Sequence, residues 1–111
     1  MVAGGSDAPV VSYNPFLGMY AAVTRRTQTG RVLGSEEKVT VEEAIRLFTI
    51  NAAYSTFEED LKGSIEVGKL ADMIVLDRDI LTIPPEEIKE IRVLMTMIGG
   101  EVVYKAPEFN I

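Results

Sequence analysis

The sequence predicts one small domain of the α+β class. Before residue 60, apolar residues recur at helical spacing in two stretches, whereas after residue 60 they alternate or form short continuous runs, as in strands. A glycine pair between two apolar runs near the C-terminal end adds a β-hairpin. The chain has 111 residues, which suits one hydrophobic core and not two.

The first predicted helix covers residues 15–27. Asn14 supplies an N-cap and Pro15 a proline in the first turn, and apolar residues then fall on one face. Arg25 and Arg26 would stand in the last turn, where the helix dipole or a nearby carboxylate is the favoured partner. An anionic group of a substrate is the alternative partner for these two arginines.

The second predicted helix covers residues 41–54. Thr40 and Glu43 have the spacing of a capping box, in which each side chain accepts a hydrogen bond from the backbone N–H of the other residue. The apolar residues that follow fall on one face, which the helix can bury against the rest of the domain.

β structure is predicted from Leu61 onward. Ile65 and Val67 alternate with polar residues between two glycines, which is typical of a strand that is exposed on one face. Residues 73–76 form a short continuous apolar run that suits a buried strand. Both patterns differ from the helical spacing of the first half.

A short helix and a hairpin are predicted for the C-terminal part. The helix is expected to begin at the proline pair 84–85 and to reach about residue 90. Residues 93–98 and 102–104 flank Gly99-Gly100, a two-residue turn that glycine favours because it tolerates positive φ.

Composition excludes several functions. Eleven basic residues against seventeen acidic ones give a net charge of −6, without the clustered cations that nucleic acid requires, so no nucleic acid is expected as a partner. No apolar stretch approaches the roughly 18–20 residues that span a membrane, and we expect a cytoplasmic protein. With neither cysteine nor histidine, the chain lacks a thiolate nucleophile and the usual metal ligand.

Several segments resemble the amidohydrolase superfamily, especially its amidohydrolase 3 branch. Residues 5–10, Gly-Ser-Asp-Ala-Pro-Val, are similar to the end of the catalytic barrel of that family. Later segments are similar to the family in its own order, and the block 63–77 is the most specific of them. The matching segments are 5–10, 22–25, 40–44, 49–53, 63–77 and 96–104.

This resemblance implies part of a (β/α)₈ metallo-hydrolase barrel and of a β-sandwich that both chain termini build. Residues 1–60 would form the C-terminal end of the barrel, with the exit of its last strand and its terminal helices. Residues 61–111 would form the C-terminal part of the small β-sandwich. Met1 and Val2 stand directly before the aspartate loop, which favours a truncated, C-terminal fragment.

Asp7 is the candidate catalytic residue and metal ligand by this resemblance. The family holds divalent metal, with zinc expected here, through histidines, a carboxylated lysine or glutamate, and an aspartate whose position Asp7 occupies. The parent protein would hydrolyse a non-peptide carbon–nitrogen bond, amide or cyclic amide, of a small-molecule substrate, and Asp7 would return a proton to the leaving amine. Because the histidines are missing, we expect the isolated chain to bind no metal and to be inactive.

Simpler interpretations stand beside these. Taken alone, Asp7 is more typical of an aspartate that orders a glycine-rich turn. Asp72, Asp77 and Asp79 suit strand-end turns better than a metal site, because the first two bracket a strand that rises about 3.3 Å per residue. Surface positions are expected for three glutamate pairs, 36–37, 58–59 and 86–87.

The alternative function is a non-catalytic α+β module that binds or regulates another protein. Half of a sandwich would leave strand edges uncovered, and such edges pair readily with other chains. We therefore expect a homo-oligomer or association with the missing part of the barrel, and no contact with membranes.

Overall fold

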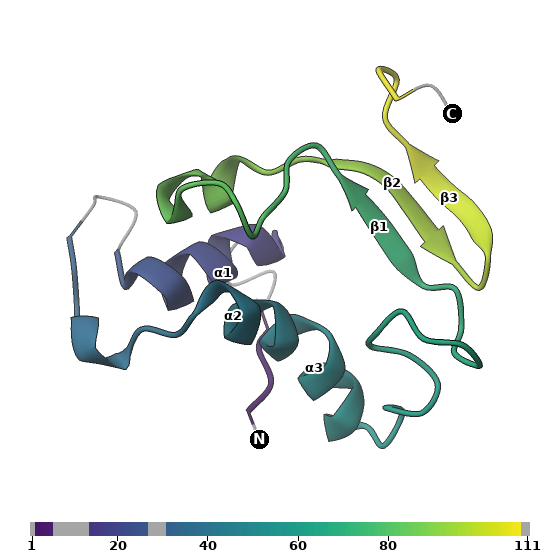
Figure 1. Ribbon diagram of the computed structural model, residues 1–111, viewed down its shortest axis with the longest axis horizontal. Coiled ribbons are helices and arrows are strands. Elements are labelled where there is room, and N and C mark those ends of the chain that lie inside the picture. Colours follow the sequence, from purple (N-terminus) through teal and green to yellow (C-terminus); the bar gives the residue numbers. More distant parts are fainter. Residues whose placement is uncertain (1, 6–13, 27–30, 110–111) are drawn as a thin grey trace.

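The computed structural model describes residues 2–5, 14–26 and 31–109. In these ranges the helices gather at one end of the molecule and a three-stranded antiparallel sheet, in the order β1-β2-β3, lies at the other (Figure 1). The α+β class predicted from the sequence is thus observed. No helix in the described part of the chain is long and apolar enough to cross a membrane.

Helix α1 covers Pro15–Thr24 and begins as predicted. The Asn14 Oδ1 atom accepts a hydrogen bond of 2.9 Å from the backbone N–H of Phe16. The predicted C-terminal end at residue 27 is wrong, because Arg25 adopts a left-handed conformation with φ of 57° and its N–H bonds to the Ala21 carbonyl. The helix therefore stops before the two arginines.

The second predicted helix is two helices, α2 at Val41–Phe48 and α3 at Ile50–Ser55. The capping box before α2 is present, with both reciprocal hydrogen bonds of Thr40. Thr49 interrupts the helical path with φ of −125° and ψ of −96°. Its hydroxyl donates to the Ile45 carbonyl over 2.7 Å, a local bond that competes with regular helix geometry.

The segment between α3 and the sheet forms turns, so the strand predicted around Ile65 and Val67 is wrong. These two side chains are 80% and 107% exposed and pair with no strand in the described residues. Gly63, with φ of 101°, lies so close to α3 that a Cβ atom there would come within 2.9 Å of the Ile50 Cα. Packing against the helix, rather than side-chain alternation, sets the path of this segment.

The sheet agrees with the sequence. Strand β1 covers Met73–Leu76, β2 covers Val93–Ile98 and β3 covers Glu101–Lys105. Gly99 and Gly100 form the two-residue turn with φ of 58° and 83°, and Ile98 pairs with Glu101 at its base. The expected short helix is a 3₁₀-helix, η2, at Pro85–Glu90.

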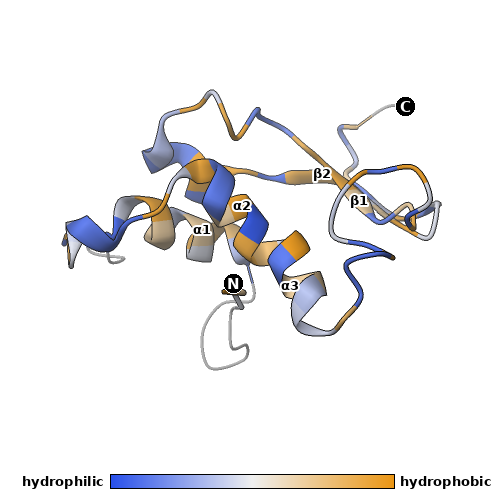
Figure 2. Ribbon diagram, turned by 60° about the horizontal axis from the view of Figure 1, so that its bottom comes forward, coloured by the Kyte–Doolittle hydropathy of each residue, from blue (hydrophilic) through white to orange (hydrophobic). Residues whose placement is uncertain are grey.

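The hydrophobic core lies among the helices and not under the sheet. Ile88 of η2 is fully buried and packs with Ile91 against α1 and α2. By contrast, every residue of β3 is exposed, although apolar residues continue along the strands (Figure 2). The buried core cluster consists of Phe16, Met19, Tyr20, Val23, Ala44, Ile88 and Ile91.

Candidate functional site

Asp7, the candidate catalytic residue and metal ligand, lies outside the described residues. The segment that precedes it, residues 2–5, is described and runs past the junction of α2 and α3 (Figure 1). The Gly4 N–H donates to the Leu47 carbonyl over 2.8 Å. The Asn51 side-chain amide donates to the Val2 carbonyl, also over 2.8 Å.

An aromatic ring fixes the same segment from the other side. A Cβ atom at Gly4 would come within 2.9 Å of the Phe48 ring, and a Cβ atom at Gly18 of α1 would come within 2.8 Å of it. Both distances are shorter than real Cβ contacts, so a side chain at either position would force the Phe48 ring to move. The ring of Phe48 therefore fills a notch between the N-terminal segment and α1.

An open groove of about 1120 Å³ lies between the α2–α3 pair, the turns after α3 and the sheet. Its walls are mainly apolar, with Ile45, Phe48 and Ile50 on the helical side and Met73 and Ile98 on the sheet side. Charged side chains, among them those of residues 46, 58, 62 and 66, also line it. The groove could accept an apolar segment or a small molecule, and the sequence patterns gave no sign of it.

Ser64 and Glu66, two polar residues that line this groove, form a local network with the neighbouring Lys69. Lys69 Nζ lies 2.8 Å from Ser64 Oγ and 3.1 Å from Glu66 Oε2, and the Ser64 hydroxyl donates to the same carboxylate. These contacts, from Ser64 first and Lys69 second, lower the pKa of Glu66. A carboxylate held ionised in this way is a poor proton donor near neutral pH.

The pKa of the Glu58 carboxyl is also lowered by neighbouring side chains. The Thr56 hydroxyl, followed by Lys62 at 3.2 Å, lowers the pKa of the Glu58 carboxyl. Its neighbour Glu59 departs from the expected surface position, because it is half-buried and its Oε2 atom is buried without a hydrogen-bond partner in the described residues. The pair at 36–37 is exposed as predicted.

Arg25 contacts a nearby carboxylate, one of the two structural partners that the sequence favoured. Its Nε donates to the Leu33 carbonyl over 2.9 Å, and its guanidinium lies 3.6 Å from Glu37 Oε2. The neighbouring Arg26 is exposed, and its backbone forms an isolated bridge with Val32. A nearby carboxylate is thus the partner of Arg25, although the helix ends before it.

The three aspartates around β1 accept hydrogen bonds from backbone N–H groups, but only Asp79 does so within its own turn, as predicted. Asp72 Oδ1 accepts from the Gly99 N–H over 2.8 Å, and Asp77 Oδ1 accepts from the Arg92 N–H over 3.0 Å. Asp79 Oδ1 accepts from the Leu81 N–H two residues later. Asp72 and Asp77 therefore tie the two ends of β1 to backbone beside β2, whereas Asp79 orders a local turn.

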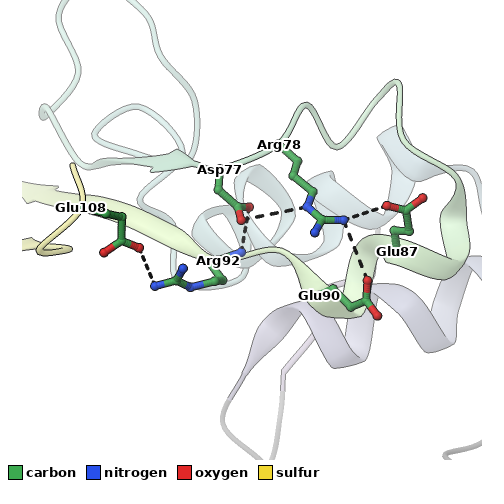
Figure 3. Close-up of polar contacts among 6 residues, drawn as sticks. All are labelled: Asp77, Arg78, Glu87, Glu90, Arg92 and Glu108. Atoms are coloured by element: carbon green, nitrogen blue, oxygen red, sulfur yellow. Dashed lines mark hydrogen bonds and ion pairs between the residues drawn. The ribbon is translucent and has the colours of Figure 1, made fainter. Parts of the chain in front are cut away.

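Arg78 links the end of β1 to η2 (Figure 3). Its guanidinium lies 2.7 Å from Glu87 and 3.9 Å from Glu90, and Arg92 pairs in turn with Glu108 of the C-terminal segment (Figure 3). These half-exposed ion pairs tie together the elements that carry Ile88 into the core. They form a structural network and not a binding site for an anion.

The described residues do not by themselves form a metal site. Histidine and cysteine are absent from the sequence, and the described residues contain no group of three or more acidic side chains that could hold a metal. Carboxylates alone, dispersed as these are, give neither the ligand number nor the geometry of a zinc site. A zinc centre of the histidine-rich kind that the resemblance implies would need donors that this sequence does not contain.

Comparison with known proteins gives the family. Residues 1–104 match the family model described as "Amidohydrolase family". The chain belongs to this family. Its resemblance to the amidohydrolases, read from the motifs of the sequence, is thereby confirmed.

The amidohydrolase relatives are much longer than this chain. N-substituted formamide deformylase of Arthrobacter pascens is 40% identical over 104 residues, which are 94% of this chain and 19% of the relative. The putative amidohydrolase YtcJ of Bacillus subtilis is 36% identical over 108 residues, 95% of this chain and 20% of the relative. The chain thus spans about a fifth of the length of these proteins.

A solved structure shares the fold. The crystal structure of an amidohydrolase from Thermotoga maritima superimposes on this chain with a TM-score of 0.66 at 23% sequence identity. The superimposed region covers 90% of this chain and 22% of the Thermotoga maritima chain. The elements of this chain are therefore arranged as in part of that longer protein.

Sequence reasoning did not identify the role of Asn51. This residue was noted only within the motif 49–53, yet its side chain holds the segment before Asp7. A signal was present, because asparagine inside a helical run tends to direct its amide to nearby backbone rather than to support the helix. The identity of its acceptor, 49 positions away, is not visible in the pattern.

Proposed function

We propose that this chain is the C-terminal part of a metal-dependent amidohydrolase that hydrolyses a non-peptide carbon–nitrogen bond, amide or cyclic amide, of a small molecule. The observation that carries the proposal is the family match, which extends over residues 1–104 and includes the Gly-Ser-Asp motif around Asp7. The names of the relatives support this reaction class, since they include a formamide deformylase, an imidazolonepropionase and a deaminase.

In this proposal residues 1–60 form the end of a (β/α)₈ barrel and residues 61–111 part of a β-sandwich. The helical first half and the antiparallel sheet of the second half support this division. Active sites of such barrels lie at the C-terminal ends of the strands, where the loop that carries Asp7 would belong.

Asp7 is the residue of this chain that we assign to the chemistry. Its carboxylate is proposed to bind the metal and to pass the proton released by the attacking water to the leaving nitrogen, as the carbon–oxygen bond forms and the carbon–nitrogen bond breaks. In the longer protein, a divalent metal, zinc by expectation, would supply the activation of water and the polarisation of the carbonyl group. Because this chain lacks the other donors, we propose that it is inactive by itself and acts together with the remaining part of the barrel.

The test uses an active enzyme that contains residues 1–111, made by joining the chain to the remaining part of the formamide deformylase, with which it shares 40% identity. Asp7→Asn should lower kcat at least about 100-fold, since proton transfer by a positioned group contributes about 10²–10⁴. Asp79→Asn, which alters an exposed turn, is the matched control and should retain activity. Full activity of the Asp7→Asn enzyme would refute the assignment.

A non-catalytic binding module is the second candidate, and the open apolar groove favours it. A module of this kind should bind a partner whether or not Asp7 is present. Equal activity of the joined enzyme with and without the Asp7 carboxylate, combined with a stable 111-residue monomer, would favour this alternative.

A further inference from the structure

We infer that Asn51, together with the notch around Phe48, positions the loop that carries Asp7. The inference rests on the proposed function, because it assigns a purpose to the anchor of residues 2–5. Asn51 is a positioning residue here, and it acts on the reaction only through the segment that it holds.

The anchor depends on the break between α2 and α3. In one continuous helix, the Leu47 carbonyl would face the N–H four residues later, within the helix. At the break, this carbonyl accepts instead from the Gly4 N–H, and the Asn51 amide reaches the Val2 carbonyl, each over 2.8 Å. The interruption at Thr49 thus provides an acceptor and a donor for an incoming chain.

The two hydrogen bonds involve residues two apart, through Val2 C=O and Gly4 N–H. In extended chain, groups of residues two apart point to the same side, so Val2 C=O and Gly4 N–H can face the junction together. A donor and an acceptor at this spacing fix both the direction and the register of the segment. A register shift of one residue would turn these groups away from α2 and α3.

Steric fit adds a third constraint. Gly4 and Gly18 both lie against the Phe48 ring, so the segment is held at a fixed distance from α2 and α1. Asp7 is two residues beyond Gly5, and two residues of extended chain span at most about 7 Å. The position of Gly5 therefore limits where the Asp7 carboxylate can reach.

The first experiment measures amide hydrogen exchange at Gly4 in the 111-residue chain. Asn51→Asp keeps the shape of the side chain but removes the N–H donor, and we expect exchange at Gly4 to become at least about tenfold faster. Asn51→Gln retains a donor and should preserve most of the protection. The matched control is Ser55→Ala, which removes a hydrogen bond internal to α3.

The second experiment measures kinetics in the joined enzyme. Asn51→Asp should lower kcat by about 10- to 100-fold with KM within about twofold, because displacement of a reacting group by about 1 Å can cost about 100-fold. Asn51→Gln should recover most of the rate. A purely structural role would lower the melting temperature and leave kcat per folded molecule unchanged, which would overturn the inference.

A second variant keeps the inference testable if Asn51→Asp does not fold. Gly4→Ala places a methyl group against the Phe48 ring and should reproduce the loss of kcat, and Phe48→Leu should relieve part of it. Unchanged Gly4 exchange in Asn51→Asp would overturn the anchor alone. Full activity of Asp7→Asn would overturn the proposed function, and with it the purpose of the anchor, independently of the exchange result.

Discussion

Replacement of Ile88 by alanine tests whether the 3₁₀-helix η2 closes the core. The Ile88 side chain is completely buried, against α1 and α2. Truncation of a buried isoleucine to alanine costs about 2–5 kcal/mol, through lost transfer free energy and the cavity left behind. We expect a value near the middle of this range, about 3 kcal/mol, because the neighbouring core side chains can fill the cavity only in part.

The assay is urea unfolding of both forms at 25 °C, followed by circular dichroism. The matched control is Ile65→Ala, which makes the same chemical change at a side chain that is 80% exposed and should alter the free energy of unfolding by less than about 0.5 kcal/mol. Equal m-values would show that the same surface unfolds in each form. If Ile88→Ala lowers the free energy of unfolding by an amount within about 1 kcal/mol of the Ile65→Ala value, the assignment of the core to the helical end of the molecule is refuted.

Three further predictions follow from the caps and ion pairs. Thr40→Ala should lower the free energy of unfolding by about 1 kcal/mol in the same assay, because it removes the capping acceptor of α2, whereas Thr40→Ser should retain it. Folding holds the pKa values of Glu43, Glu58 and Glu66 below the ordinary 4.5, so their stabilising effect is fully present above about pH 4.5 and is lost as pH falls through the lower, folded-state values. Glu43→Gln should therefore weaken the acid dependence of the melting temperature, and an unchanged profile would contradict the capping geometry. Arg78→Met should cost at most about 1 kcal/mol at low salt, and 1 M NaCl should reduce the difference if screened ion pairs are its cause.

The sheet and the helix starts could be predicted because their causes are local. Gly99-Gly100 between two apolar runs fixes a hairpin through the positive φ of both residues. Asn14 and Thr40 cap the helices that follow them through side chains only two or three residues away. Such signals are complete within a few residues, so no knowledge of the tertiary structure is needed to recognise them.

The errors concern residues whose conformation depends on distant contacts. Arg25 ends α1 in a left-handed conformation while its side chain bonds to Leu33 and Glu37 in the segment that follows. Ile65 and Val67 alternate like strand residues, but the turn at Gly63 packs on α3 and leaves them exposed. Hydrophobic periodicity indicates which residues could lie on one face of an element. It does not indicate which other element that face packs against.

The break between α2 and α3 at Thr49 is a feature that hydrophobic periodicity did not predict and that bears on the proposed function. Helical periodicity runs through Thr49 without interruption, and the signal for a break at that position is weak, namely a threonine and an asparagine within the run. The structure uses the break to receive residues 2–5, which lie more than forty positions earlier in the sequence. Local sequence favours a continuous helix, and the docked segment favours two. A disagreement of this kind between local preference and structure is expected where a protein holds a functional group in place. If Asn51 and Phe48 position the segment that leads to Asp7, the least predictable feature of the helical region is the one that serves the proposed chemistry.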